Sequence, residues 1–382
     1  MITTINNEHK ELNFSSDREQ SQACLNSAEH EKNQGRKVLN VPNLRFPEFQ
    51  GEWEEYRIED ITENISSGRC KSHSPNGKYN LYGSTGIIGK TDEACYEGNL
   101  VLVARVGANA GSLQIINELC GITDNTLIIK PKEVNAQYLY FFLQHFNLNR
   151  LIFGSGQPLI TGGMLKKVKV SLGTVQEQNK LTKLLSLLDE RIATQNKIID
   201  KLQSLIKGIA QKIVHSNKTN VHLSECVECS YSPLQESDVC EHGAYPVYGA
   251  NGIVGYLDNY NTEGEAVYII KDGSGVGTVS YVTGKCSATG TLNTLQAKEG
   301  YSLQYLYYLL KVFNFKPYKT GMAIPHIYFK DYGKAKFFCP SYIEQLQYAQ
   351  SLSAIDSKLL VEKNILTSLS MQKKYLLRQM FI

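Results

Sequence analysis

Residues Val101 to Leu113 read VLVARVGANAGSL, and residues Val267 to Val279 read VYIIKDGSGVGTV, 166 positions later. Each begins with an apolar run, continues through a cation and a glycine-rich segment, and returns to apolar residues. Arg105 aligns with Lys271 in this comparison. Because an internal repeat determines the whole architecture, it has to be sought before any single motif is interpreted.

Further matches keep almost the same offset. They begin at Tyr82 and Tyr248 (YGSTGIIGK and YGANGIVGY), at Tyr138 and Tyr305 (YLYFFL and YLYYLL), at Pro158 and Pro325, and at Glu177 and Glu344, each followed by Gln. The sequence therefore predicts a duplication of a unit of about 167 residues.

The composition excludes several classes of protein. A chain of 382 residues with 42% hydrophobic and 20% charged residues is ordinary for a globular protein, and no apolar run approaches the roughly 18 residues of a membrane span. Nine scattered cysteines and the absence of a secretory signal pattern lead us to expect reduced thiols and a cytoplasmic location. A net charge of +3 neither supports nor excludes binding to nucleic acid.

Each repeat has two unlike halves. In the front half, runs such as Leu100 to Ala104 and Ala266 to Ile270 precede glycine-rich turns, which is typical of strands joined by hairpins. The back halves begin near Thr174 and Ser341, lack proline and repeat apolar residues at steps of three and four. We expect an α+β fold with the segments 1–40 (a polar, mobile tail), 41–173 (first domain), 174–215 (long helix), 216–340 (second domain) and 341–382 (long helix).

The two long helices carry the pattern of a coiled-coil seam. At about 40 residues each they are far longer than an average globular helix, so pairing with each other is favoured over packing along their own domains. Gln195 and Glu362 are polar breaks at equivalent repeat positions, which suits selection of the pairing register. The predicted pairing residues are Leu188, Ile192, Gln195, Ile199 and Leu202 in the first helix and Ile355, Leu359, Glu362, Leu366 and Leu369 in the second.

Three features invite a chemical interpretation. The segment Asp272 to Gly277, DGSGVG, is followed by a strand-like run rather than a helix, so we expect a hairpin with glycines at positive φ and not a nucleotide loop. Cys226, Cys229, Cys240 and His242 are candidates for a zinc site, but their second gap is one residue, and ordinary thiols are favoured. The Glu-Gln pairs are expected to cap the long helices.

Together these features resemble the DNA specificity subunit of Type I restriction-modification systems. The resemblance rests on VPNLRFPEF from Val41 to Phe49, on Trp53, on the YGxxG[IV][IV]G turns, the [RK]xGxxxG hairpins, the Glu-Gln helix starts and the twofold repeat. It covers residues 41 to 382. The duplicated architecture is its most specific part.

The resemblance implies two target-recognition domains held apart by an antiparallel pair of helices, each domain reading one half of a split double-stranded DNA target. The helices also dock the methyltransferase (modification) subunits. Adenine methylation with S-adenosylmethionine belongs to those subunits, and ATP- and Mg-dependent translocation and cleavage to the restriction subunit. The chain itself is expected to be non-catalytic and to hold no cofactor.

Candidate DNA-contacting residues come from comparing the repeats, because positions that differ within a shared frame can read different half-sites. They are Ser84, Thr85, Lys90, Arg105, Asn109, Gln157, Asn251, Tyr256, Lys271, Ser274, Lys319 and His326. Arg105 and Lys271, the shared cation, suit phosphate contact in both domains. For each residue a solvated loop side chain remains the alternative.

The paired helices also suggest how the spacing of the target is set. Two rigidly joined readers on one duplex must address grooves about one helical turn apart, so inserting four residues near Gln195 is expected to change the spacing and leave each half-site unchanged. A free-standing DNA-binding regulator or an orphan S-like protein stays open as an alternative. An enzyme that uses the Cys/His cluster is the outside alternative.

Overall fold

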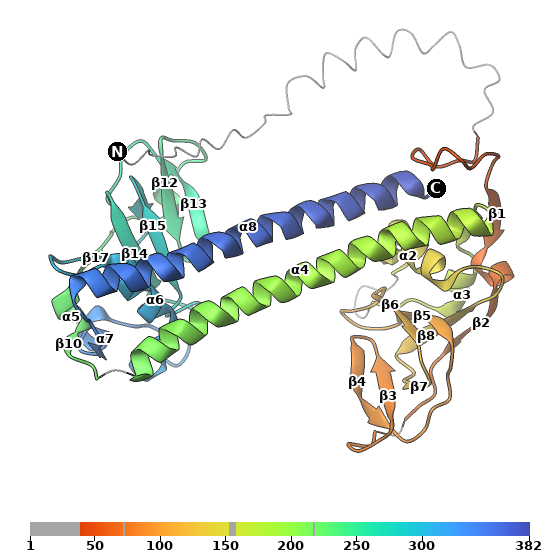
Figure 1. The fold of residues 1–382 in the computed structure, drawn as a ribbon, viewed down its shortest axis with the longest axis horizontal. Helices are drawn as coiled ribbons and strands as arrows, with labels where there is room; N and C mark the ends of the chain where they lie inside the picture. The colour runs from red at the N-terminus through yellow and green to blue at the C-terminus, as the bar shows by residue number, and fades with distance from the viewer. Residues whose placement is uncertain (1–38, 72, 153–157, 217) are drawn as a thin grey trace, which may run out of the picture. The chain divides into compact units, whose positions relative to one another are not determined.

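The computed structural model describes residues 39–71, 73–152, 158–216 and 218–382, and Figure 1 shows their course. The predicted tail of residues 1–40 therefore lies outside the described residues except for its last two positions. The chain forms two compact units: unit 1 extends to Leu185 and also contains Lys374–Ile382, and unit 2 is Ser186–Lys373. Each unit contains helix and sheet, which confirms the predicted α+β class.

Among the residues that the structure describes, unit 1 contains two main sheets, a short strand pair, two shorter α-helices and parts of the two long ones, including residues 374–380. The four-stranded sheet has the order β2-β8-β5-β6, the three-stranded sheet has the order β4-β3-β7, and β1 pairs with β9. The elements are β1 (Glu54–Arg57), η1 (Ile58–Ile61), β2 (Thr62–Ser67), β3 (Tyr79–Gly83), β4 (Gly86–Thr91), β5 (Asn99–Ala104), β6 (Leu113–Asn117), β7 (Cys120–Ile122), β8 (Thr126–Pro131), α2 (Ala136–Phe146), η2 (Leu148–Leu151), α3 (Gly162–Lys166), β9 (Lys169–Leu172) and the first part of α4 (Val175–Ser216).

Unit 2 repeats this topology strand for strand. Its sheets have the orders β11-β17-β14-β15, β13-β12-β16 and β10-β18. The elements are β10 (Val221–His222), α5 (Leu223–Cys226), β11 (Val227–Tyr231), η3 (Glu236–Asp238), β12 (Tyr245–Gly249), β13 (Gly252–Leu257), β14 (Glu265–Ile270), β15 (Val279–Thr283), β16 (Ser287–Ala288), β17 (Leu292–Ala297), α6 (Leu303–Val312), η4 (Lys316–Tyr318), α7 (Phe329–Tyr332), β18 (Lys336–Phe337) and most of α8 (Tyr342–Met380).

One inner strand of the four-stranded sheet in each unit, β5 or β14, is apolar on both faces. In β5, Val101 and Val103 pack into the cluster that contains α2, whereas Leu100 and Leu102 pack toward β7. Strand β14 divides its residues between two clusters in the same way. A strand covered on both faces needs an unbroken apolar run, and this explains why the repeated runs do not alternate with polar residues.

The glycine-rich segments are hairpin turns, as predicted. Strand β5 pairs antiparallel with β6, and β14 pairs antiparallel with β15. Gly107, Gly111, Gly273 and Gly277 all have φ between 78° and 90°, which side chains with a Cβ rarely adopt. The glycines are therefore needed for the backbone path of the loop rather than for approach to a nucleotide.

Within unit 2 the long helices pack antiparallel over residues 186–216 and 342–373. Asp189 forms an ion pair with Lys373 at 2.5 Å, and the amide of Gln195 donates to the carbonyl oxygen of Glu362 at 3.0 Å and to its carboxylate. Of the predicted pairing residues, Leu188, Gln195, Ile199, Leu359, Glu362 and Leu369 are buried, and Ile192, Leu202, Ile355 and Leu366 are half-buried.

Among the described residues, no helix combines the length and the apolar composition that a membrane span requires.

The hairpin glycines allow a matched test of packing. A Cβ at Gly277 would lie 3.0 Å from Cβ of Phe315, whereas a Cβ at Gly284 would meet nothing within 4 Å, although both residues have φ near 90°. We expect Gly284→Ala to cost about 1 kcal/mol of unfolding free energy from backbone strain alone, and Gly277→Ala to cost about 1 to 3 kcal/mol more. Urea denaturation of both variants measures the difference. Equal losses would show that Phe315 moves without cost.

Candidate nucleic-acid interface

Several loops meet at one end of unit 1. The backbone N–H of Arg105 donates to Asn125 O at 2.8 Å, and the Ser84 hydroxyl donates to the same oxygen at 3.3 Å. Gly107 N donates to Pro158 O at 3.0 Å, and Ile160 N donates to Arg105 O at 2.9 Å. These contacts join residues 84–85, 105–112, 123–125 and 158–161, which we call the loop edge of unit 1.

Unit 2 builds the same edge with the same backbone bonds. Lys271 N donates to Thr291 O at 3.0 Å, Gly273 N donates to Pro325 O at 3.0 Å, and Ile327 N donates to Lys271 O at 2.9 Å. The loop edge of unit 2 comprises residues 250–251, 271–278, 289–291 and 320–327. Because main-chain groups hold both edges, side chains on them can differ without changing the scaffold.

The shared cation sits in the middle of each edge. Arg105 is half-buried, its Nη1 lies 3.3 Å from the Ser67 hydroxyl, and its buried Nε has no hydrogen-bond partner among the described residues. Lys271 is half-buried with its Nζ 5.4 Å from the centroid of the Tyr231 ring. Both cations are thus only partly buried and lie on a fixed backbone, so each can donate hydrogen bonds to an anionic ligand.

The structure brings some of the other unit 1 candidates to the loop edge. Thr85 and Asn109 are exposed there, and Ser84 is half-buried. Lys90 is exposed at the far end of β4 from the turn, where its Nζ donates to Asn80 Oδ1 at 2.8 Å. Gln157 lies outside the described residues.

Unit 2 places its candidates similarly. Asn251 and Ser274 are exposed on the loop edge, and Lys319 is exposed next to it. His326 is on the edge, with Nδ1 2.6 Å from Oδ1 of Asp272. Tyr256 pairs with Pro246 at the far end of β13 from the turn, so the structure does not bring it to the edge.

The loop from Thr320 to His326 projects an apolar tip. Its ends exchange two backbone hydrogen bonds, Thr320 N to His326 O at 2.9 Å and His326 N to Thr320 O at 2.7 Å. Met322 is fully exposed and Ile324 is 57% exposed. A pinned loop with apolar side chains in solvent suits contact with a partner surface.

The tyrosines of the YG turns support the fold rather than the surface. The Tyr82 hydroxyl bonds to the Glu118 carboxylate, and burial together with this bond raises the pKa of Tyr82 to about 12. The same bond and one from Asn80 lower the pKa of Glu118. The Tyr248 ring lies 5.7 Å from that of Tyr268, centroid to centroid.

The candidate zinc ligands are spread over different environments. Cys226 is buried with its Sγ 3.8 Å from that of Cys339, Cys229 is half-buried and Cys240 is exposed. The bond to Cys339 and burial raise the pKa of Cys226, which opposes the thiolate that a metal needs. The described residues contain no group of three or more His, Cys, Asp or Glu side chains arranged to hold a metal ion.

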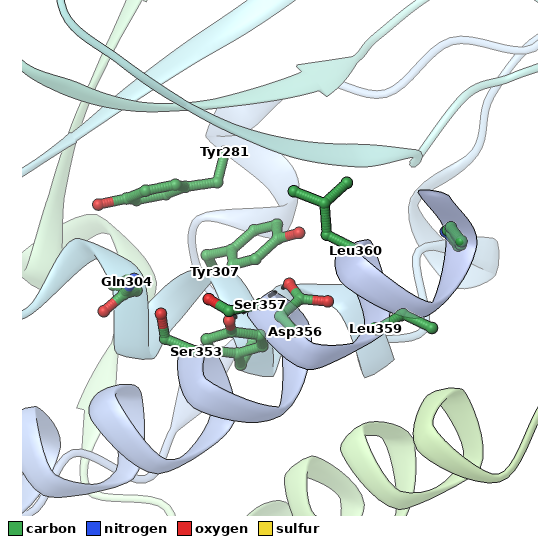
Figure 2. Close-up of a pocket in the computed structure, with 10 residues that line it drawn as sticks. Tyr281, Gln304, Tyr307, Ser353, Asp356, Ser357, Leu359 and Leu360 are labelled. Carbon is green, nitrogen blue, oxygen red and sulfur yellow. Dashed lines mark hydrogen bonds between the residues drawn. The ribbon is translucent and has the colours of Figure 1, made fainter. Parts of the chain in front are cut away.

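One pocket of unit 2 lies between α6, α8 and β15 (Figure 2). Its single carboxylate, Asp356, accepts a hydrogen bond from the Tyr308 hydroxyl at 3.3 Å and lies 4.0 Å from Nζ of Lys311. The rest of the lining is mainly tyrosine and serine hydroxyls and leucine side chains. The pocket can contact a partner surface, but the carboxylate of Asp356 already interacts with Tyr308 and Lys311.

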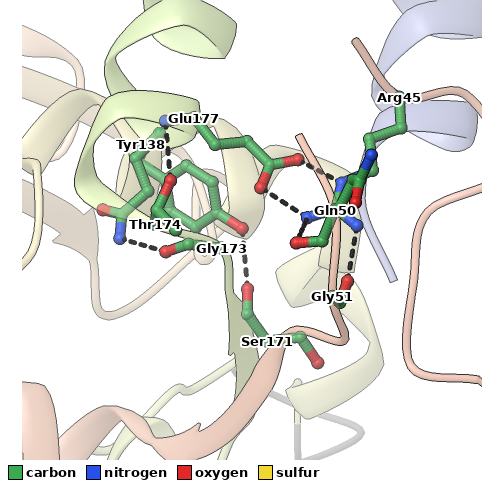
Figure 3. A network of polar contacts seen from close by, with 9 residues as sticks. Arg45, Gln50, Gly51, Tyr138, Ser171, Gly173, Thr174 and Glu177 are labelled. Atoms are coloured by element: carbon green, nitrogen blue, oxygen red, sulfur yellow. Dashed lines mark hydrogen bonds and ion pairs between the residues drawn. The ribbon is translucent and has the colours of Figure 1, made fainter. Parts of the chain in front are cut away.

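The capping prediction for the Glu-Gln pairs is correct for Glu344 and wrong for the carboxylate of Glu177. Glu344 accepts from Ser341 N at 3.1 Å. Glu177 is buried, and both of its carboxylate oxygens bind Arg45, at 2.7 and 2.8 Å (Figure 3). A buried carboxylate requires a cation, and the fork of Arg45 binds both oxygens. Sequence reasoning did not single out Arg45, which lies within the VPNLRFPEF segment.

The glutamines of these pairs share one role that the repeat did not reveal. Gln178 Nε2 donates to Gly173 O at 3.0 Å and its Oε1 accepts from Asn135 N at 3.4 Å. Gln345 Nε2 donates to Pro340 O at 3.0 Å and its Oε1 accepts from Ser302 N at 2.9 Å. Asn135 and Ser302 are the N-caps of α2 and α6, so each glutamine ties a long helix to its own domain.

Comparisons with known proteins agree with this duplicated architecture. The family model described as "Type I restriction modification DNA specificity domain" matches residues 50–204 and again residues 217–371. A putative type I specificity subunit of Mycoplasma genitalium is 25% identical over 338 residues, which is 81% of this chain and 88% of that protein. One from Mycoplasma pneumoniae is 25% identical over 235 residues, 55% of this chain and 62% of that protein. The crystal structure of a Type-I restriction-modification S subunit from M. genitalium superposes with a TM-score of 0.69 at 20% identity, over 90% of this chain and 99% of that one.

Proposed function

Because the chain belongs to the Type I restriction modification DNA specificity family, we propose that its two units read the two halves of one bipartite DNA target. The chain is the DNA-recognition subunit of such a system. The observation that carries the proposal is the pair of loop edges, which share their backbone hydrogen bonds and differ in their exposed side chains.

The chemistry of DNA assigns different roles to the cations and to the other polar side chains on each edge. Arg105 and Lys271 hold the same scaffold position and supply phosphate contacts, which set position without reading sequence. Exposed or half-buried donors and acceptors read base edges in the major groove. These are Ser84, Thr85 and Asn109 in unit 1 and Asn251, Ser274, Lys319 and His326 in unit 2. Since the side chains differ, the two half-sites differ.

The partner subunits supply the rest of the system. The modification subunits dock on the long helices and carry S-adenosylmethionine and the adenine methylation, and the restriction subunit carries ATP, Mg and cleavage. The chain itself performs no chemistry. With a net charge of only +3, the isolated chain binds DNA weakly and in a salt-sensitive manner, and the modification subunits add phosphate contacts.

Sequencing the methylated bases of a host with and without this gene tests the proposal. A bipartite adenine-methylated motif that disappears on deletion of the gene is the expected result. Target-specific binding by the chain with no methyltransferase partner, and no such motif, would instead identify a free-standing regulator.

The shared cations give the first functional prediction. We expect Arg105→Ala and Lys271→Ala each to weaken binding of the assembled complex to specific and unrelated DNA by a similar factor. Each should also reduce the slope of log K against log salt by about 0.9, the value for one lost phosphate contact. Lys285→Ala is the control, because Lys285 pairs with Glu263 at the opposite end of β14. A change confined to one DNA sequence would mean that the cation reads a base.

The continuous helix α4 gives the second functional prediction. Inserting one heptad in α4 after Gln195 and one in α8 before Glu362 keeps the seam in register and lengthens both helices by about 10 Å, close to three base pairs. Three heptads in each add about 32 Å, close to one turn of DNA. We expect a longer spacer and unchanged half-sites, most clearly in the second variant, as read from the methylated motif. Altered half-sites with an unchanged spacer would contradict this role.

Exposed apolar side chains on α4 give the third functional prediction. Leu187, Ile198 and Leu205 are separated by 11 and 7 residues, so they lie on one face of the helix, and they are 55%, 37% and 48% exposed. We expect Leu187→Glu with Leu205→Glu to reduce co-purification of the modification subunit at least tenfold. Asn196→Glu, half a turn away and also exposed, is the matched control. Equal co-purification in both variants would place the docking surface elsewhere.

A further inference from the structure

One isolated β-bridge is present in both loop edges. Its side chains are apolar in one unit and polar in the other. In unit 1 the bridge joins Val106 and Leu159, and in unit 2 the equivalent bridge joins Asp272 and His326. All four residues are half-buried at the surface. The backbone is therefore the same at this point, and an apolar pair in one unit is replaced by a hydrogen-bonded polar pair in the other.

We propose that this bridge is a specificity-determining position, and that His326, oriented by Asp272, accepts a hydrogen bond from the exocyclic amino group of an adenine or cytosine in the half-site that unit 2 reads. The inference rests on the proposed function, because it names one contact by which unit 2 reads its half-site.

The geometry holds the His326 ring firmly. Its Nδ1 lies 2.6 Å from Oδ1 of Asp272, and both side chains are 35% exposed. The backbone around it is fixed by hydrogen bonds from His326 N to Thr320 O at 2.7 Å and from Ile327 N to Lys271 O at 2.9 Å. On the other side, Gly321 has φ of 86°, and a Cβ there would lie 3.1 Å from Cδ2 of the ring. The imidazole is thus enclosed on the Nδ1 and Cδ2 sides.

This orientation decides what the outer nitrogen can do. An ionised carboxylate can only accept a hydrogen bond, so Nδ1–H of the neutral ring donates to Asp272 and the lone pair of the ring lies on Nε2. No described residue bonds to Nε2, and this atom is not among the buried polar atoms that lack a partner. An outward acceptor matches adenine N6 and cytosine N4, the amino donors in the major groove. It does not match the O6 and N7 acceptors of guanine.

The apolar bridge of unit 1 can also read a base, but by apolar contact instead of a hydrogen bond. Val106 and Leu159 offer no donor or acceptor in their side chains, and apolar side chains contact the 5-methyl group of thymine.

Asp272 is a positioning residue in unit 2, because it acts on DNA only through the ring that it holds. Its carboxylate would repel phosphate if the histidine were removed.

The test uses the full chain assembled with its modification subunit. The wild-type methylated motif first defines both half-sites, and binding is then measured to duplexes in which each base pair of both half-sites is replaced in turn. For His326→Leu we expect discrimination at one A·T or C·G position of one half-site to fall about five- to tenfold, the range for one hydrogen bond. Asp272→Ala should lower it partly, and Asp272→Asn should retain most of it, since an amide oxygen can still accept from Nδ1.

The unchanged half-site is the internal control for folding, and Glu263→Gln, at the opposite end of β14, is the control for an ion pair lost from the same unit. Unchanged discrimination in His326→Leu would overturn the inference while leaving the proposed function intact. Weakening by the same factor for every duplex, with no loss of discrimination at any position, would also overturn it, because that result assigns the pair to the scaffold. A wild-type complex with no bipartite motif would overturn the proposed function itself, and this inference with it.

Discussion

The antiparallel packing of α4 against α8 is the constraint on which the rest of the molecule depends. In unit 2 it is an apolar seam interrupted by Gln195 and Glu362, whose side chains bond to each other while buried. A seam of leucine and isoleucine alone would tolerate sliding by one heptad, whereas a shift here would leave the buried amide of Gln195 without its partner and the carboxylate of Glu362 with Lys358 alone. The polar pair therefore selects one register.

Recognition is built on a separation between main-chain and side-chain roles. Each loop edge is held by hydrogen bonds between backbone groups, with glycines at the turns, so the position of the loops does not depend on the side chains that face solvent. The bridge that carries Val106 and Leu159 in one unit and Asp272 and His326 in the other shows how far the chemistry can change on one backbone. Such a scaffold suits a protein that must read two different sequences.

Much of this arrangement could be predicted from the sequence, because duplication leaves a signal that no single residue determines. The matched runs, the glycine turns and the long apolar seams each predicted an element that the structure contains. Side-chain partners far apart in sequence could not be predicted. Glu177 has the spacing of a capping residue, yet it binds Arg45, 132 positions away. Lys90 and Tyr256 differ between repeats but lie at the far ends of their hairpins, because sequence comparison does not show which end of a strand faces a ligand.

The apolar stripe on α4 has a consequence for the life of the protein in a cell. A chain that exposes Leu187, Ile198 and Leu205 on one helical face presents an apolar surface that can associate with other apolar surfaces. Copies synthesised in excess of their partners would self-associate or be removed by chaperones and proteases. If the modification subunits cover this face, as we propose, the amount of this protein that persists would follow the supply of those subunits, and its dosage would be limited without any dedicated regulator.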